Sequence, residues 1–363
     1  MPPLLLASRL SRLRARAPRR LNAGGVSTRR SLYLAPPFLV DDYTPRYKLL
    51  SSVDAAKKRS QAYAHLSKCN LCPRLCNVNR FETTGHCLIP GSSVSVNTIA
   101  PHFGEEPCLQ GHHGSGSVFF SGCNLRCVFC QNYDIAHRKA GFDVAPEELA
   151  QWMMKLQTLG RCHNVNFVTP EHVVPQVVLA VLHAADMGLR IPIVYNTSAF
   201  DSVESIELLD GIVDIYLPDF KVWSGATAKR LLKAERYREA ACESVKAMHE
   251  QVGDLVFTPD GVAQSGVLVR HLVMPGYADE GVEIVRWLAA NVGTDLMLHV
   301  MEQYFPRAHV GKKGRGKEGE GEVRYRDINR PVKMDEVDVV KKAAREAGLW
   351  RFIEAAEHGG FNI

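Results

Sequence analysis

The 363-residue sequence has no uninterrupted apolar stretch of the roughly eighteen residues that a membrane-spanning helix needs. It also lacks a signal peptide with a small-residue cleavage site, although ten cysteines would suit a secreted, disulfide-rich protein. Hydrophobic residues make up 46% of the chain, enough for a large core. We therefore expect a soluble globular protein without a membrane partner, in a reducing compartment that handles metals.

Acidic residues are absent from positions 1–40, where eight arginines accompany the amphipathic start LLLASRL. Such a segment is typical of a mitochondrial transit peptide, and the alternative is a disordered basic tail on a cytoplasmic protein. Without those eight arginines, 36 basic residues remain against 39 acidic ones. The rest of the protein is near neutral, so a nucleic-acid partner has no electrostatic support.

A fourth cysteine is missing beside Cys123, Cys127 and Cys130, which follow an apolar run with the spacing C-x3-C-x2-C. A structural zinc site needs four ligands, and His137 is the only nearby imidazole. Three thiolates can instead hold three irons of a [4Fe–4S] cluster, which leaves the fourth iron open to activate a small molecule. We predict a catalytic cluster here; a structural metal loop or buried thiols are the alternatives.

Four other cysteines form a complete ligand set with the spacing C-x2-C-x3-C-x10-C. Four thiolates make a closed site, which suits zinc or a second iron–sulfur cluster used structurally or as an electron relay. The spacing does not distinguish the metals, and unliganded buried thiols are the alternative. These four residues are Cys69, Cys72, Cys76 and Cys87. The isolated cysteines, which we expect to be small buried hydrophobic residues, are Cys108, Cys162 and Cys242.

From residue 117 onward, apolar runs alternate with helical patterns, which predicts an α/β fold with a parallel sheet and right-handed crossovers. Such a sheet is either doubly wound or rolled into a partial barrel. The predicted strands cover 117–121, 164–169, 192–197, 213–217, 267–273 and 296–301. The predicted helices cover 53–65, 146–159, 174–187, 203–209, 226–250, 280–291 and 334–348.

The chain divides into four predicted regions. Residues 1–40 are the targeting segment or tail, and 41–110 are a linker with a cysteine-rich metal-binding extension. Residues 111–306 form the core, with a hairpin at 255–262 that turns at Pro-Asp-Gly. Residues 307–363 combine a charged, glycine-rich loop at 311–321, predicted to be a mobile insertion, with a C-terminal helix.

The three-cysteine loop, with Phe129 before its last cysteine, resembles the signature of the radical S-adenosylmethionine (SAM) superfamily. Residues from about 65 to 306 resemble one branch of it, proteins similar to pyruvate formate-lyase-activating enzyme. The resemblance implies an open partial (βα)6 barrel. The matching segments are CNLCPRLCNVNR (69–80), HFGEEP (102–107), GSGSVFFSGCNLRCVFCQNYDIAH (114–137), NVNFVTPEH (164–172), IVYNTS (193–198), DIYLPDFK (214–221), LVRHLVMPG (268–276) and QYFP (303–306).

The resemblance also implies cofactor-binding residues. Phe129 would lie near the adenine of SAM. Asp219 and Lys221 are similar to an Asp-Leu-Lys motif implicated in SAM and monovalent-cation binding, and alternate strand positions place both side chains on one face. The alternative is a salt-bridged strand end. Arg270 takes the place of an arginine near SAM, and its fork of donors suits a carboxylate. Asn196 stands where relatives have a cation-binding Asp, which weakens the cation prediction.

One motif departs from the family pattern. Activating enzymes carry Gly-Gly-Glu after the second strand, whereas this chain has Thr-Pro-Glu-His at 169–172. The backbone carbonyls could still receive the SAM amino group. The role of Glu171 stays open, as does that of His271, for which a core role is at least as well supported.

These features predict a radical SAM oxidoreductase. It would cleave SAM reductively at a [4Fe–4S] cluster and generate a 5′-deoxyadenosyl radical, as the activase of a glycyl-radical enzyme does. Its implied partners are SAM, an electron donor such as a ferredoxin or flavodoxin, and a protein substrate. One alternative is a radical SAM enzyme that modifies a small molecule or another protein residue. The other is a non-catalytic carrier of an iron–sulfur cluster or zinc.

Overall fold

The computed structural model describes residues 37–314 and 322–353. Almost all of the predicted targeting segment (1–40) and most of the predicted glycine-rich insertion (311–321) lie outside these ranges. Within them, no helix combines the length and apolar character that crossing a membrane requires.

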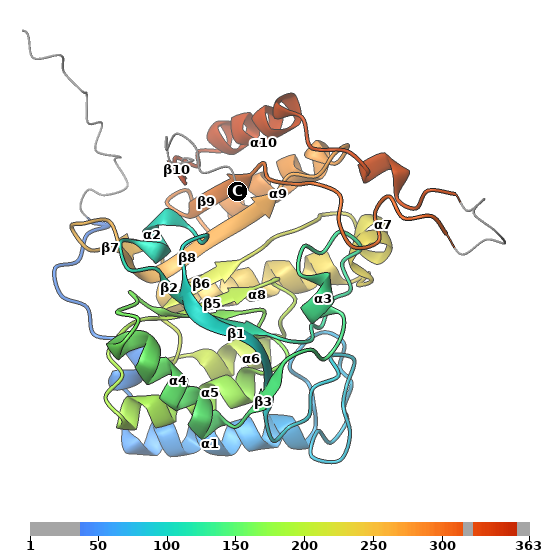
Figure 1. Cartoon of the computed structure of the whole chain (residues 1–363). Coiled ribbons are helices and arrows are strands. Elements are labelled where there is room, and N and C mark those ends of the chain that lie inside the picture. The colour runs from blue at the N-terminus through green and yellow to red at the C-terminus, as the bar shows by residue number, and fades with distance from the viewer. Residues whose placement is uncertain (1–36, 315–321, 354–363) are drawn as a thin grey trace, which may run out of the picture.

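A mostly parallel sheet forms the centre of the molecule (Figure 1). All six predicted strands are confirmed, and neighbours pair in parallel. The middle strands are apolar and buried on both faces, as expected where helices cover a parallel sheet. The six strands are β2 (Ser115–Phe120), β4 (Val165–Val168), β5 (Ile193–Thr197), β6 (Ile215–Pro218), β8 (Ala263–Leu272) and β9 (Met297–Met301).

Additional strands extend the sheet at both edges. On one side β1 (Val94–His102) pairs antiparallel with β2, and β3 (Phe142–Val144) pairs with β1. On the other side β10 (Arg351–Phe352) pairs with β9. The predicted hairpin is confirmed, because β7 (Val256–Phe257) pairs antiparallel with β8. In the part of the chain that the structure describes, the sheet runs from β10 to β3 and its edges do not join.

Helices cover the sheet in two groups (Figure 1). One group stacks α1 and α4 against α5, whose residues are almost all buried, and the other pairs α9 with α10. Ser51 caps α1 by accepting a hydrogen bond from the Asp54 amide (3.1 Å). The bounds are α1 (Ser52–Ser67), α4 (Pro146–Thr158), α5 (Val174–Asp186), α6 (Val203–Leu209), α9 (Ala278–Asn291) and α10 (Met334–Glu346), with shorter η2 (Arg46–Lys48), α2 (Pro107–Gln110), α3 (Tyr133–Ala136) and η5 (Arg326–Ile328).

The prediction of a single helix over 226–250 is wrong. The structure has α7 (Gly225–Thr227), a π-helical turn η3 (Ala228–Leu232), and then α8 (Tyr237–Val252). Lys233 ends the turn in the left-handed region (φ 61°). The break frees backbone carbonyls that bind the three-cysteine loop, and π-turns of this kind often occur at functional sites.

Candidate active site

The three-cysteine loop follows β2, at the carboxyl end of the parallel strands, where barrel active sites are built. Cys123 and Cys127 are buried, Cys130 is half-buried, and all three are free thiols. The Leu125 amide donates to Cys123 Sγ (3.3 Å). The predicted ligands therefore lie together in one loop that positions them near the end of the strand.

Backbone hydrogen bonds from the interrupted helix fix this loop. The amide of Val128 donates to the carbonyl of Leu231 (2.8 Å), and that of Arg126 donates to Leu232 (3.2 Å). On the other side, the His309 amide donates to the Val128 carbonyl (2.9 Å). The loop is thus held between η3 and the segment that follows β9.

Burial keeps the thiols protonated in the absence of a counter-charge. It raises the pKa of Cys127 to about 12, against the opposing effect of the Lys221 ammonium. Burial, followed by the carboxylate of Glu171, raises the pKa of Cys123 far above its ordinary value. A cationic metal centre would reverse this balance, because a coordinating thiol is deprotonated. The donor set of three free thiols, two of them buried and one half-buried, therefore fits an iron–sulfur cluster.

Four of the five predicted cofactor-binding residues meet beside this loop. Arg270 donates through Nε to Asp219 Oδ1 (2.6 Å), through Nη1 to Glu105 Oε1 (2.9 Å) and through Nη2 to Asn196 Oδ1 (2.8 Å). Lys221 Nζ pairs with Asp219 Oδ2 (2.7 Å). Asp219 thus holds both cations, one on each carboxylate oxygen.

Ion pairing determines which side chains of this cluster are charged. Burial alone would raise the pKa of Asp219, but Arg270 and Lys221 outweigh it and hold that pKa below its ordinary value. Burial would likewise lower the pKa of Lys221, but Asp219 and then Cys127 raise it overall. Lys221 is therefore a cation that faces both the acid and the cysteine loop.

Phe129 does not join this group. Its ring packs against Tyr304, with 6.0 Å between centroids, and is buried. His271 also points away from the charged group: its Nδ1 contacts the Phe220 carbonyl (2.8 Å), and burial lowers its pKa. The core role considered for His271 fits this placement.

Two acidic residues that the sequence analysis left without a role enter the site from the turn between β1 and α2. Glu105 Oε2 accepts hydrogen bonds from Asn196 Nδ2 (2.9 Å) and Asn166 Nδ2 (3.0 Å), besides its pair with Arg270. Glu106 Oε1 lies 2.8 Å from His299 Nδ1. The two adjacent acidic residues in the motif HFGEEP were the only sign of this role in the sequence. Only the fold shows that both reach Arg270.

A buried acid pair lies behind the loop. Glu171 accepts a hydrogen bond from the Ser198 amide, and its second oxygen has no hydrogen-bond partner among the described residues. Asp201 accepts from Tyr195 Oη and Thr197 Oγ1, both at 2.6 Å. Burial, and then the nearby Glu171, raise the pKa of Asp201 to about 8.

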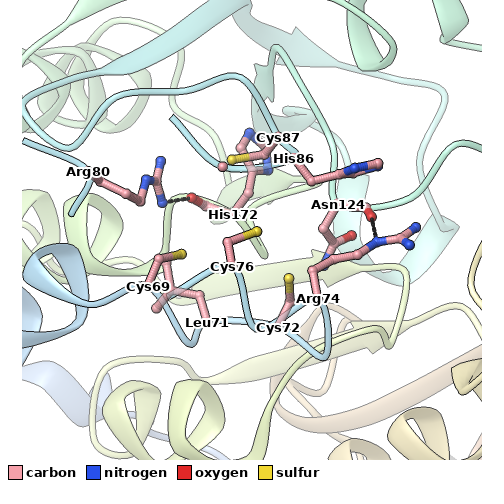
Figure 2. Close-up of a pocket in the computed structure, with 11 residues that line it drawn as sticks. Cys69, Leu71, Cys72, Arg74, Cys76, Arg80, His86, Cys87, Asn124 and His172 are labelled. Carbon is pink, nitrogen blue, oxygen red and sulfur yellow. Dashed lines mark hydrogen bonds between the residues drawn. The ribbon is translucent and has the colours of Figure 1, made fainter. Parts of the chain in front are cut away.

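The other four cysteines line a single pocket (Figure 2). Its wall also includes Arg74, Arg80, His86 and His172, and Asn124 from the three-cysteine loop. In the described ranges, however, no three His, Cys, Asp or Glu side chains are arranged to hold a metal ion. The metal-binding role of both cysteine sets therefore stays a prediction.

Comparisons with known proteins decide the family. The model of the radical SAM superfamily matches residues 117–288. An uncharacterized protein of Methanocaldococcus jannaschii, MJ0674, is 31% identical over 291 residues, which cover 77% of this chain and 75% of that protein. The chain belongs to the radical SAM superfamily.

Among solved structures, HydG, a maturase of the [FeFe]-hydrogenase, has a TM-score of 0.42 and 13% identity, over 84% of this chain and 64% of its own. Streptococcus suis SuiB bound to its precursor peptide SuiA has a TM-score of 0.40 and 12% identity over 65% of this chain. The chain spans about half of SuiB, 47% of its length.

As a radical SAM enzyme, the protein uses SAM and a [4Fe–4S] cluster, which together supply a 5′-deoxyadenosyl radical when bound. Its sheet is that of a partial radical SAM barrel, and the cysteine loop at 123–130 falls within the matched range.

Proposed function

We propose that this radical SAM enzyme abstracts hydrogen from a polypeptide glycine, as an activase of a glycyl-radical enzyme does. The observation that carries the site assignment is the convergence of Arg270, Asp219, Lys221 and Asn196 beside the three-cysteine loop. The choice of substrate rests on the resemblance of the surrounding motifs and on the open sheet.

Cys123, Cys127 and Cys130 would hold three irons of the cluster and leave the fourth free for SAM. Lys221, which pairs with Asp219 and interacts electrostatically with Cys127, would supply a positive charge for the SAM carboxylate. Arg270 adds a planar fork of donors suited to the same group. Asp219 aligns the two cations by pairing with one on each carboxylate oxygen.

Glu105 acts as a positioning residue. It accepts a hydrogen bond from Arg270 Nη1 and from the amides of Asn166 and Asn196, so it holds the guanidinium at Nη1 while Asp219 holds it at Nε. A guanidinium fixed in this way loses less entropy when it binds a carboxylate.

The open sheet supports a protein substrate. Because the β10 and β3 edges do not join in the described residues, a loop of another protein can approach the strand ends from the side. The near-neutral composition after residue 40 offers no steering for a strongly charged partner, so recognition would depend on shape and apolar contact.

Anaerobic incubation of the full-length enzyme with SAM, a reductant and a fractionated cell extract tests the proposal. We expect methionine and 5′-deoxyadenosine, together with a protein-bound glycyl-radical doublet in the EPR spectrum. Transfer of deuterium from a labelled small metabolite into 5′-deoxyadenosine, without a protein radical, would contradict the choice of a glycine substrate.

A further inference from the structure

The pocket of Cys69, Cys72, Cys76 and Cys87 is built by a chain segment that folds back on itself. The Cys69 amide donates to the Val78 carbonyl (3.0 Å), and the Asn77 amide donates to the Cys69 carbonyl (2.9 Å). All four thiols are free and face the pocket (Figure 2). Four free thiols around one pocket form a complete ligand set for a closed thiolate site.

The charges around the pocket are of one sign. Its wall contains two arginines and no acidic residue. Arg80 is 1% exposed, and in the part of the chain that the structure describes its guanidinium donates only to the backbone carbonyls of Ile89, Pro90 and His172. Arg74 donates through Nε to the Asn124 carbonyl (2.9 Å), while its buried Nη2 atom has no hydrogen-bond partner within 37–314 and 322–353. A buried cation such as Arg80 normally has an anionic partner, and among the described residues neither Arg80 nor half-buried Arg74 has one.

Arg74, Arg126 and Gly122 connect the pocket to the three-cysteine loop. Arg74, which lines the pocket, reaches the three-cysteine loop through its hydrogen bond to Asn124, the residue directly after Cys123. Arg126 of the catalytic loop donates through Nη2 to the His86 carbonyl (2.7 Å). Gly122 (φ 80°) approaches the Cys87 carbonyl so closely that a Cβ there would lie 2.6 Å from the oxygen.

We propose that Cys69, Cys72, Cys76 and Cys87 bind a second, closed metal centre through four thiolates, with Arg74 and Arg80 as its counter-charges. One Zn²⁺ bound by four thiols releases four protons and leaves a net charge of −2. A [4Fe–4S]²⁺ cluster bound by four thiolates has the same charge. Either centre provides the anion that the two arginines lack.

This metal centre would stabilise the neighbouring three-cysteine loop. Because Asn124 lines the pocket and binds Arg74 through its carbonyl, metal binding would order the residue directly after Cys123. The centre is separate from the proposed SAM site, so its absence would not contradict SAM cleavage at the 123–130 loop.

Metal analysis of the anaerobically purified full-length protein tests the proposal. The variant Cys72→Ala/Cys76→Ala should lose one centre per chain. Loss of zinc alone would identify zinc, and loss of iron with acid-labile sulfide would identify an iron–sulfur cluster. The control Cys162→Ala/Cys242→Ala also removes two thiols, from isolated positions, and should retain all metal. Equal metal in the two variants would overturn the proposal.

A measurement on the wild-type protein tests the same proposal without depending on whether the variant folds. In the purified holoprotein, Cys69, Cys72, Cys76 and Cys87 should resist alkylation, as mapped by mass spectrometry, and should become reactive after chelator treatment. Half-buried Cys242 serves as the reference thiol. Alkylation of the four cysteines at the same rate before and after chelation would contradict a metal centre.

Arg74→Gln tests the counter-charge separately. It should lower metal affinity at the four-cysteine pocket about tenfold, as loss of outer-shell partners of a metal site does. Arg59→Gln, which removes a surface arginine paired with Asp186, should leave metal affinity unchanged. Unaltered affinity in Arg74→Gln would contradict the counter-charge role.

Discussion

The two cysteine loops touch each other but have opposite electrostatic surroundings. The four-cysteine pocket is bordered by arginines that bind backbone carbonyls and by no acid. The three-cysteine loop faces a group in which each cation already has a carboxylate partner. The first arrangement suits a permanent, closed anionic centre. The second arrangement consists of ion pairs within the protein, which a zwitterionic cofactor such as SAM can replace with ion pairs of its own.

The largest expected effect comes from removing the open set of thiols. Cys123→Ala/Cys127→Ala/Cys130→Ala should reduce 5′-deoxyadenosine formation to background, by at least about 100-fold, which exceeds the effect of losing outer-shell partners. Product is measured by mass spectrometry after anaerobic reconstitution. The control Cys162→Ala/Cys242→Ala should retain activity, whereas undiminished product from the triple variant would refute the assignment.

Replacing Arg270, whose guanidinium lies beside the three-cysteine loop, should have the next largest effect on the enzyme. Arg270→Lys keeps the charge but loses the bidentate geometry, so we expect KM for SAM to rise about tenfold. Arg286→Lys, at an exposed arginine paired with Glu283, is the matched control. Identical KM values for the two variants would remove Arg270 from the SAM site.

A smaller effect is expected at the positioning residue. Glu105→Gln retains an acceptor for Arg270 but loses the charge and the oxygen that accepts two asparagine amides. KM for SAM should rise about threefold with kcat nearly unchanged, equivalent to the loss of one ordinary hydrogen bond. Glu283→Gln is the control. A fall in kcat alone would argue against positioning of the guanidinium.

The ion pairs of Asp219 can be tested through the dependence of folding stability on pH. The folded pKa of Asp219 is depressed, so its ionisation stabilises the folded state above its unfolded pKa of about 3.9 and this contribution is lost as pH falls through the folded pKa. Asp219→Asn should cost about 3 kcal/mol at neutral pH. The stability gap to wild type, measured by urea unfolding, should narrow below about pH 4. A gap independent of pH would contradict the ion-pair account.

Much of the central sheet could be predicted from the sequence because apolar runs bounded by turn residues mark buried parallel strands. β1 was not predicted, since it has only three buried residues and carries Pro101 near its end. It forms through pairing with β2. The break between η3 and α8 was also missed, because no proline or glycine marks it. It depends on hydrogen bonds to Arg126 and Val128.

The site could be predicted where a motif concentrates its residues. The cysteine sets and the Asp-Phe-Lys triplet are local patterns, and the structure brings Asp219 and Lys221 together as alternation on one face requires. Glu105 could not be assigned, because its contact with Arg270 joins positions 165 residues apart. Only the folded path of the β1–α2 turn supplies that information.

EPR spectroscopy of the reduced, anaerobically reconstituted variants tests the division of roles between the two loops most directly. The account predicts that addition of SAM alters the cluster signal of Cys72→Ala/Cys76→Ala and produces no such change in Cys123→Ala/Cys127→Ala/Cys130→Ala. A SAM-dependent change that survives in the triple variant and disappears from the double variant would contradict it.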